Sequence, residues 1–265
     1  MIDYNVSDVI EIIRREVPEA VQEEWDNSGI QILFGNIKVN KILTCLDVTE
    51  AVAREAVDTG VQLIVSHHPV LFGGVKSIED RDFKGRIIQT LIKNEISVYS
   101  AHTSFDKAEK GNNRVVAELL QLTDIHCPES TDICMVGNIP VDMPVRLADF
   151  AEYVSQKLET KGKDSIRFAG NPDKLVRTAG ICTGSGSEFA GLLKEAGCHV
   201  LITGDVRYHE ALDAVSEDFA IIDAGHFGTE RFFPGAMMRI LREQLRDCVE
   251  IISSQKEKNP FTQVY

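Results

Sequence analysis

Short apolar runs alternate with amphipathic stretches along most of the chain. The runs are brief and rich in β-branched residues, which predicts buried strands at residues 30–34, 42–46, 61–65, 96–100, 134–139, 165–168, 176–182, 200–203, 220–223 and 249–252. Apolar positions at helical spacing predict helices near residues 7–17, 50–58, 82–93, 145–158, 188–196, 208–215 and 229–246. Ser7 and Thr49 are the expected caps of the first two helices. Strands that alternate with helices are typical of a layered α/β fold with a largely parallel sheet.

One stretch interrupts this alternation. Residues 123–131 are polar and irregular and contain Pro128. We therefore expect the chain to cross into a second structural unit there.

Composition narrows the class of protein. The chain has 265 residues, 43% of them apolar and 26% charged, which is ordinary for a soluble globular protein. Its net charge of −13 disfavours binding to nucleic acid. No stretch is long and apolar enough to span a membrane, and the first residues lack the features of a signal peptide, so we expect a cytoplasmic protein. The six cysteines never have Cys-x-x-Cys spacing, which argues against a zinc ribbon or a disulfide framework.

Polar clusters of histidines and carboxylates follow three of the predicted strands. They are His67 and His68 after residues 61–65, His102 and Asp106 after residues 96–100, and His226 and Glu230 after residues 220–223. Ligands of open α/β sheets bind at the carboxyl edges of the strands, so side chains that are distant in sequence can meet there. The sequence therefore predicts one polar crevice built from three strand ends.

The residue types in these clusters indicate the chemistry. His226 and Glu230 are four residues apart at the start of a predicted helix, which places both on one face. Imidazole and carboxylate ligands together suit zinc, iron, manganese, cobalt or nickel better than calcium or magnesium. Five such ligands, with one carboxylate bridging, could hold two ions and leave positions open for water.

At these positions the sequence resembles the Nif-three-like family, also called the GTP cyclohydrolase I type 2 family, in its short form without a central insert domain. The resemblance extends from the first quarter of the chain to the last. The matching segments are Trp25-Asp26-Asn27-Ser28-Gly29, Leu46-Asp47-Val48-Thr49, Ser66-His67-His68-Pro69, Ala101-His102-Thr103-Ser104-Phe105-Asp106, Thr203-Gly204-Asp205 with His209, Gly225-His226-Phe227-Gly228-Thr229-Glu230, and Asn259-Pro260-Phe261.

The resemblance implies a two-metal site. Its metal ligands would be His67, His68, Asp106, His226 and Glu230, with one carboxylate shared between two divalent transition-metal ions. Zinc is the expected metal, with iron, manganese, cobalt or nickel as alternatives. The family's nearby histidines match His102 and His209, which we expect beside the ions or facing a substrate, and Asp205 is a candidate proton relay.

The resemblance also implies an architecture. We expect two interleaved three-layer α/β/α units with mixed sheets, one formed by residues 1–124 and 221–265 and the other by residues 125–220. The first of these would carry most of the metal ligands. The family further implies a ring-shaped homohexamer whose metal sites face its interior.

The chain departs from the family's usual pattern at two places. Ser104-Phe105-Asp106 stands where Asn-Leu-Asp is usual, which leaves the ligand Asp106 in place but alters the pocket around it. Asp205 stands where Glu is usual, which shortens a carboxylate. The glycine-rich stretch 183–187 is either a plain strand-to-helix turn or an anion cradle. We expect Trp25 to be half-buried and to anchor a polar turn.

Three functions follow as hypotheses. The first is a metal-dependent hydrolase, similar to GTP cyclohydrolase I type 2, that opens the ring of a purine nucleotide. The alternatives are a metal-binding scaffold that acts through partner proteins without turnover, and a two-metal phosphoesterase. A serine hydrolase using Ser66 is disfavoured because the sequence around it is not a nucleophile elbow.

Overall fold

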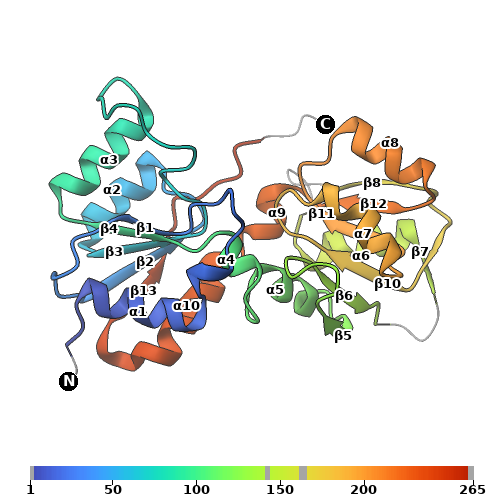
Figure 1. Ribbon diagram of the computed structural model, residues 1–265, viewed down its shortest axis with the longest axis horizontal. Helices are drawn as coiled ribbons and strands as arrows, with labels where there is room; N and C mark the ends of the chain where they lie inside the picture. Colours follow the sequence, from blue (N-terminus) through green and yellow to red (C-terminus); the bar gives the residue numbers. More distant parts are fainter. Residues whose placement is uncertain (1–2, 141–143, 161–165, 262–265) are drawn as a thin grey trace. The chain divides into compact units, whose positions relative to one another are not determined.

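The computed structural model describes residues 3–140, 144–160 and 166–261, and the chain forms two compact units (Figure 1). The first unit comprises Met1–Ala108 and Phe233–Lys258, and the second comprises Glu109–Phe232 and Asn259–Tyr265. The units are therefore interleaved in sequence. The predicted boundaries at residues 124 and 221 each fall inside a strand that pairs within the second unit's sheet, so the units divide at other positions.

The first unit is built on a five-stranded sheet with strand order β1-β4-β3-β2-β13. All neighbouring strands are parallel except β1, which is antiparallel to β4. The strands are β1 (Gly29–Ile32), β2 (Lys41–Cys45), β3 (Leu63–Ser66), β4 (Ser97–Ser100) and β13 (Glu250–Ser253). The helices are α1 (Val6–Glu16), η1 (Glu19–Val21), α2 (Glu50–Thr59), α3 (Phe83–Lys93), α4 (Thr103–Asp106), α10 (Phe233–Leu245) and η3 (Arg246–Cys248).

Helices cover both faces of this sheet, with α2 and α3 on one face and α1 and α10 on the other (Figure 1). On the α2 and α3 side, Leu43, Ile64 and Val98 of the strands form a buried cluster with residues of both helices. Local signals set the helix ends. Asn5, rather than the predicted Ser7, caps α1, and Thr49 caps α2 as predicted.

The second unit is built on a six-stranded sheet with strand order β5-β6-β10-β11-β12-β8, and a separate pair of strands, β7 and β9. Strands β10, β11 and β12 are parallel, and the others run antiparallel to their neighbours. The strands are β5 (Thr123–His126), β6 (Met135–Asn138), β7 (Val145–Arg146), β8 (Arg167–Ala169), β9 (Leu175–Val176), β10 (Thr178–Ile181), β11 (Val200–Thr203) and β12 (Ala220–Asp223). The helices are α5 (Asn112–Leu119), α6 (Leu147–Lys157), η2 (Ser187–Phe189), α7 (Ala190–Glu195), α8 (Tyr208–Ser216) and α9 (His226–Glu230).

This sheet also lies between two helical layers. Residues of α5 and α6 pack with Val200, Ile202 and Ile222 in one buried cluster. Residues of α7 and α8 pack with Leu201 and Ile221 in another. Because successive residues of a strand face opposite sides, β11 and β12 contribute to both clusters. Each unit is therefore a three-layer α/β/α structure with a mixed sheet, as the sequence predicts.

Several predicted elements differ from the structure. The polar stretch 123–131 contains β5, and α5 precedes it without having been predicted. The single helix expected over residues 229–246 is two helices, α9 and α10. Residue 165 of the predicted strand 165–168 lies outside the described residues, and β8 begins at Arg167.

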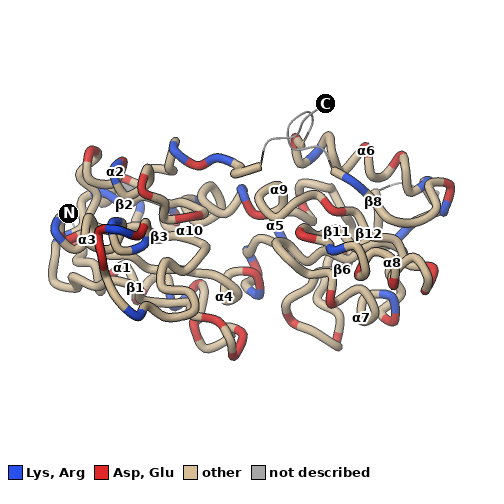
Figure 2. The backbone as a smooth tube through the Cα atoms, turned by 90° about the horizontal axis from the view of Figure 1, so that it is seen from above, with Lys and Arg blue, Asp and Glu red and all other residues tan. Residues whose placement is uncertain are grey.

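Acidic and basic residues are interspersed along both units, and the described chain has no long basic stretch (Figure 2). Among the residues that the structure describes, no helix combines the length and apolar character that crossing a membrane requires.

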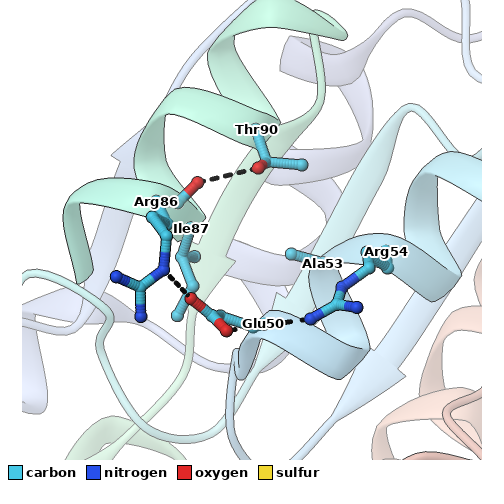
Figure 3. Close-up of a pocket in the computed structure, with 6 residues that line it drawn as sticks. All are labelled: Glu50, Ala53, Arg54, Arg86, Ile87 and Thr90. Atoms are coloured by element: carbon cyan, nitrogen blue, oxygen red, sulfur yellow. Dashed lines mark hydrogen bonds and ion pairs between the residues drawn. The ribbon is translucent and has the colours of Figure 1, made fainter. Parts of the chain in front are cut away.

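A pocket of about 330 Å³ opens between α2 and α3 in the first unit (Figure 3). Both of its guanidinium groups are engaged, since Arg86 Nε donates to Glu50 and Arg54 Nη2 lies 3.7 Å from the same carboxylate. The lining residues are Glu50, Ala53, Arg54, Arg86, Ile87 and Thr90, which include none of the predicted metal ligands.

A partly buried carboxylate ties the end of the first unit to its sheet. Glu257 accepts hydrogen bonds from the backbone N–H groups of Leu46 and Asp47. Burial, reinforced by repulsion from Asp47 and Glu55, outweighs these hydrogen bonds and raises the pKa of Glu257 to about 7. The folded protein therefore keeps a proton on Glu257 at pH values where the unfolded chain has lost it.

This shift predicts a pH dependence of stability. Protonation of Glu257 contributes to the free energy of unfolding. This contribution is fully present below the ordinary glutamate pKa of 4.5 and is lost as the pH rises through about 7. One pKa unit corresponds to about 1.4 kcal/mol, and partial exposure should reduce the total change to roughly 1–2 kcal/mol. Glu257→Gln should remove this decline, as measured by urea denaturation across that pH range. Parallel pH profiles for the variant and the parent protein would contradict this assignment.

Candidate metal centre

The first unit brings three histidines together at the carboxyl ends of two parallel strands. Strands β3 and β4 are neighbours in register, with Ser66 opposite Ser100, so the residues that follow them lie at one edge of the sheet. His67, His68 and His102 form a group whose ligand atoms all lie within 4.8 Å of one another. Their geometry could hold a metal ion.

His67 is fully buried and its orientation is fixed by the backbone. Its Nδ1 atom lies 2.8 Å from the carbonyl oxygen of Ala101. Because a carbonyl only accepts, Nδ1 must carry the hydrogen, which leaves the lone pair of the ring on Nε2. Nε2 lies 3.7 Å from Asp106 Oδ1. Two atoms bound to one tetrahedral ion at about 2.1 Å each would be roughly 3.4 Å apart, so this spacing suits a shared ion.

His68 is oriented by a carboxylate. Its Nδ1 atom lies 2.8 Å from Asp47 Oδ1 in the loop that follows β2. The backbone N–H of Asp47 in turn donates to Glu257, which holds this loop in place. A neutral His68 that donates from Nδ1 presents the lone pair of Nε2.

His102 is oriented by Asp26, whose side chain is buried and accepts hydrogen bonds from several donors. His102 Nδ1 lies 2.7 Å from Asp26 Oδ1, and Ser28 Oγ and Thr103 Oγ1 each donate to Oδ2 at 2.6 Å. The backbone N–H groups of Asn27 and Thr103 also donate to this carboxylate, at 2.6 and 3.1 Å. Burial opposes ionisation, but the hydrogen bonds from His102, Ser28 and Thr103 hold the pKa of Asp26 well below its usual value.

In the second unit, too, a histidine and a carboxylate lie just after the ends of neighbouring parallel strands. Strands β11 and β12 are parallel neighbours, with Thr203 opposite Asp223, so Asp205 and His226 follow adjacent strand ends. His226 Nδ1 lies 2.8 Å from Asp205 Oδ2, and Nε2 lies 2.9 Å from Glu230 Oε2. A neutral imidazole can donate to only one of two carboxylates. This donor set therefore suits either an imidazolium or a cation shared by Nε2 and Glu230.

Glycines make room for these side chains. Gly184 has φ +74°, and a Cβ there would lie 2.2 Å from Glu230 Oε1. A Cβ at Gly204 would lie 2.4 Å from the backbone nitrogen of His226. Close approach to the candidate ligands thus requires glycine at both positions.

The glycine-rich stretch 183–187 resembles a turn more than an anion cradle. The backbone N–H of Thr183 donates to Asn113 Oδ1 at 2.8 Å, and that of Gly184 donates to Thr229 Oγ1 at 3.0 Å. The N–H of Gly186 donates to Thr203 Oγ1 at 2.8 Å. These three donors are engaged within the second unit, which favours the strand-to-helix turn.

The two remaining predicted site residues, Asp205 and His209, lie in the second unit. Asp205 contacts His226 Nδ1, an arrangement that orients the ring. His209 is exposed on α8, where its ring packs edge-on against Tyr208 at 5.2 Å. Trp25, which we expected to be half-buried, is 62% exposed and lies edge-on to His102.

Asp26 and Asp47 have no predicted role, although both lie in segments that carry the family resemblance. Each accepts a hydrogen bond from Nδ1 of a histidine in the group of three. The carbonyl oxygen of Ala101 and the carboxylate of Asp205 play the same part for His67 and His226. The three grouped histidines and His226 therefore each have an oxygen partner at Nδ1. Metal-bound histidines typically have such a partner, because it fixes the tautomer and the orientation of the ring.

Comparisons with known proteins find relatives along nearly the whole chain. Residues 4–260 match the model of the family described as Duf34/NIF3 (NGG1p interacting factor 3). A Clostridium perfringens protein named GTP cyclohydrolase 1 type 2 homolog is 32% identical over 259 residues, which cover 97% of this chain and 98% of the relative. A Helicobacter pylori protein named GTP cyclohydrolase 1 type 2 is 32% identical over 256 residues, with the same two shares covered. The crystal structure of a Bacillus cereus protein related to NIF3 has the same fold, with a TM-score of 0.90 at 24% identity over 98% of this chain and 99% of that one.

Proposed function

The chain belongs to the Duf34/NIF3 (NGG1p interacting factor 3) family, and we propose that it is a metal-dependent hydrolase that opens the ring of a purine nucleotide. The observation that supports the metal dependence most strongly is the shared orientation of four histidines, each with Nδ1 next to an oxygen acceptor. The nucleotide substrate is supported by the names of the relatives, which include GTP cyclohydrolase 1 type 2.

The proposed centre holds two divalent transition-metal ions, with zinc first and iron, manganese, cobalt or nickel as alternatives. Its ligands are His67, His68, Asp106, His226 and Glu230. Support comes from the strand-end positions of the ligands and from the buried carboxylates of Asp106 and Glu230, since buried anions require cationic or hydrogen-bonding partners. When bound, such ions lower the pKa of water and polarise the attacked group.

The surrounding residues of the chain have distinct roles in this proposal. His102 accepts a proton at Nε2, and the ionised Asp26 at Nδ1 stabilises the imidazolium that results. Asp47 orients His68, and Asp205 both orients His226 and serves as the proposed proton relay. His209 is a candidate for contact with the substrate, because it is exposed on α8.

Turnover assays distinguish this proposal from the alternatives. Protein loaded separately with zinc, manganese or iron should open the ring of GTP, seen as a change in purine absorbance, with formate released when a second water cleaves the resulting formamide. His102→Ala should abolish turnover while metal content stays unchanged. Release of phosphate from phosphoesters without ring opening would favour a phosphoesterase. Capture of a protein partner, with no turnover under any metal, would favour a scaffold.

The family resemblance also supports a proposal about assembly. We expect a cytoplasmic homohexamer, and sedimentation equilibrium of the metal-loaded protein should give six times the chain mass. A monomer at all concentrations would contradict the hexamer.

The position of Glu230 predicts a specific role for Gly184. Gly184→Ala should displace the Glu230 carboxylate, because the new Cβ would lie 2.2 Å from Oε1. We expect zinc affinity to fall by about 10- to 100-fold, as when support for a metal ligand is lost. Gly197→Ala is the matched control, because Gly197 also has a positive φ but a Cβ there would meet nothing within 4 Å. Competition titration against a zinc chelator measures the difference, and equal affinities for the two variants would refute this role.

A further inference from the structure

Two exposed aromatic side chains lie next to the group of three histidines in the first unit. Trp25 is 62% exposed and Phe72 is 44% exposed. The ring centroids of both lie 5.9 Å from that of His102, with interplanar angles of 76° and 82°. Trp25 and Phe72 also meet each other, at 6.2 Å and 80°. The two rings therefore form a right-angled corner beside His102, which we call the aromatic corner.

The aromatic corner is held together by polar contacts between the two segments that carry its rings. Leu71 precedes Phe72, and its N–H donates to Gln31 Oε1 at 3.1 Å while its carbonyl accepts from Asn27 Nδ2 at 3.3 Å. Gln31 is only 7% exposed, and its Nε2 donates to the carbonyl of Asn27 at 2.8 Å. The turn that carries Trp25 and the loop that carries Phe72 are thus joined at fixed spacing. Such anchoring gives the two rings a defined geometry.

Core packing does not account for these rings. Large aromatic side chains contribute most to stability when they are buried, whereas Trp25 leaves most of its surface exposed. Exposed aromatic rings held in place are the usual platform for stacking a nucleobase, because every base offers a flat π face. Lys84 adds a cation nearby, since its Nζ lies 3.4 Å from the carbonyl oxygen of Phe72. A positive charge beside the rings suits the phosphates of a nucleotide.

We propose that the aromatic corner of Trp25 and Phe72 binds the planar heteroaromatic ring of a purine nucleotide and positions it beside His102. This inference rests on the proposed function for the identity of the substrate. Binding itself requires no turnover, so the two proposals can fail separately.

The chain contains a single tryptophan, which makes Trp25 its own reporter. Fluorescence is excited at the red edge of indole absorption, where purines do not absorb, in metal-free and in metal-loaded protein. Guanosine and GTP should quench the emission saturably, whereas ribose 5-phosphate and inorganic triphosphate should not. Absence of saturable quenching by either purine in both forms of the protein would overturn the proposal. Equal quenching by ribose 5-phosphate would overturn it as well.

Variants test the second ring with Trp25 still present. Phe72→Ala should weaken guanosine binding about tenfold, which is the size expected when one stacking ring is lost. Phe83→Ala is the matched control, because Phe83 is 59% exposed in the same unit. It should leave the dissociation constant unchanged. Equal effects of the two substitutions would contradict the aromatic corner.

Equilibrium dialysis with labelled guanosine tests Trp25 itself. Trp25→Ala should weaken binding about tenfold or more, whereas Trp25→Phe should retain most of it, because a flat ring remains. Unchanged thermal midpoints confirm that the variants are folded. Unaltered binding by Trp25→Ala would refute the proposal. Saturable quenching without turnover in any metal form would retain the aromatic corner and reject the hydrolase.

Discussion

Glu230→Gln is expected to lower zinc affinity by about 100-fold or more while leaving the second unit folded. Glu230 is 3% exposed, and its Oε2 lies 2.9 Å from His226 Nε2. The amide of glutamine keeps the size of the side chain but removes the negative charge. A lost ligand should weaken the site by at least as much as a lost supporting contact, for which 10- to 100-fold is typical. Competition titration against a chelator measures the change.

The control for this substitution is Glu217→Gln. Glu217 is exposed and pairs with Lys194 at 3.0 Å, away from the candidate ligands in sequence and in its contacts. It should keep the zinc affinity of the parent protein. Circular dichroism establishes that both variants are folded. Parent-like affinity in Glu230→Gln would remove Glu230 from the proposed ligand set.

Asp26→Ala is expected to have the largest effect on stability. The carboxylate of Asp26 is buried, and its loss leaves the hydrogen bonds of His102, Ser28 and Thr103 without an acceptor. Removing one partner from a buried ionic network typically destabilises a protein by about 3–5 kcal/mol. Urea denaturation measures the free energy of unfolding.

Glu24→Ala serves as the neighbouring control, because Glu24 is an exposed carboxylate two residues from Asp26. Exposed substitutions of this kind usually change stability by less than about 0.5 kcal/mol. Asp26→Asn separates charge from size, and it should be intermediate because the amide can accept some of the hydrogen bonds. A loss for Asp26→Ala no larger than that for Glu24→Ala would contradict the central role of this carboxylate.

Hydrophobic periodicity was sufficient to predict the strands and helices with strong patterns. Strands β11 and β12 fall at the predicted positions because each begins with three consecutive apolar residues, which in a parallel sheet leave little ambiguity. Strand β5 escaped prediction because its residues are mostly exposed, and an edge strand of this kind carries no apolar pattern. The break between α9 and α10 could not be predicted either, because the apolar spacing of a helix continues through both.

The candidate metal ligands could be predicted from the sequence, whereas the residues that orient them could not. Histidines at strand ends stand out in a sequence, but the residues that orient them do not. Asp47 is joined to His68 only through the packing of the loop after β2. Asp26 is 76 residues from His102, and no local spacing relates them. Contacts of this kind depend on tertiary structure, so sequence patterns alone could not assign them.

The substitution at residue 205 has a physical rationale in the backbone. Asp205 has φ +52°, a left-handed conformation that aspartate tolerates better than most residues. From this position its short side chain reaches His226 Nδ1 at 2.8 Å. The shorter carboxylate therefore still contacts the ring of His226.

Two bound transition-metal ions per chain are the central feature of the proposed site. Elemental analysis of the protein, as isolated and after reconstitution with zinc, measures this directly. We predict two equivalents of metal per chain after reconstitution, with loss of metal in His67→Ala and in Glu230→Gln. Less than one equivalent per chain after reconstitution would contradict the two-metal centre.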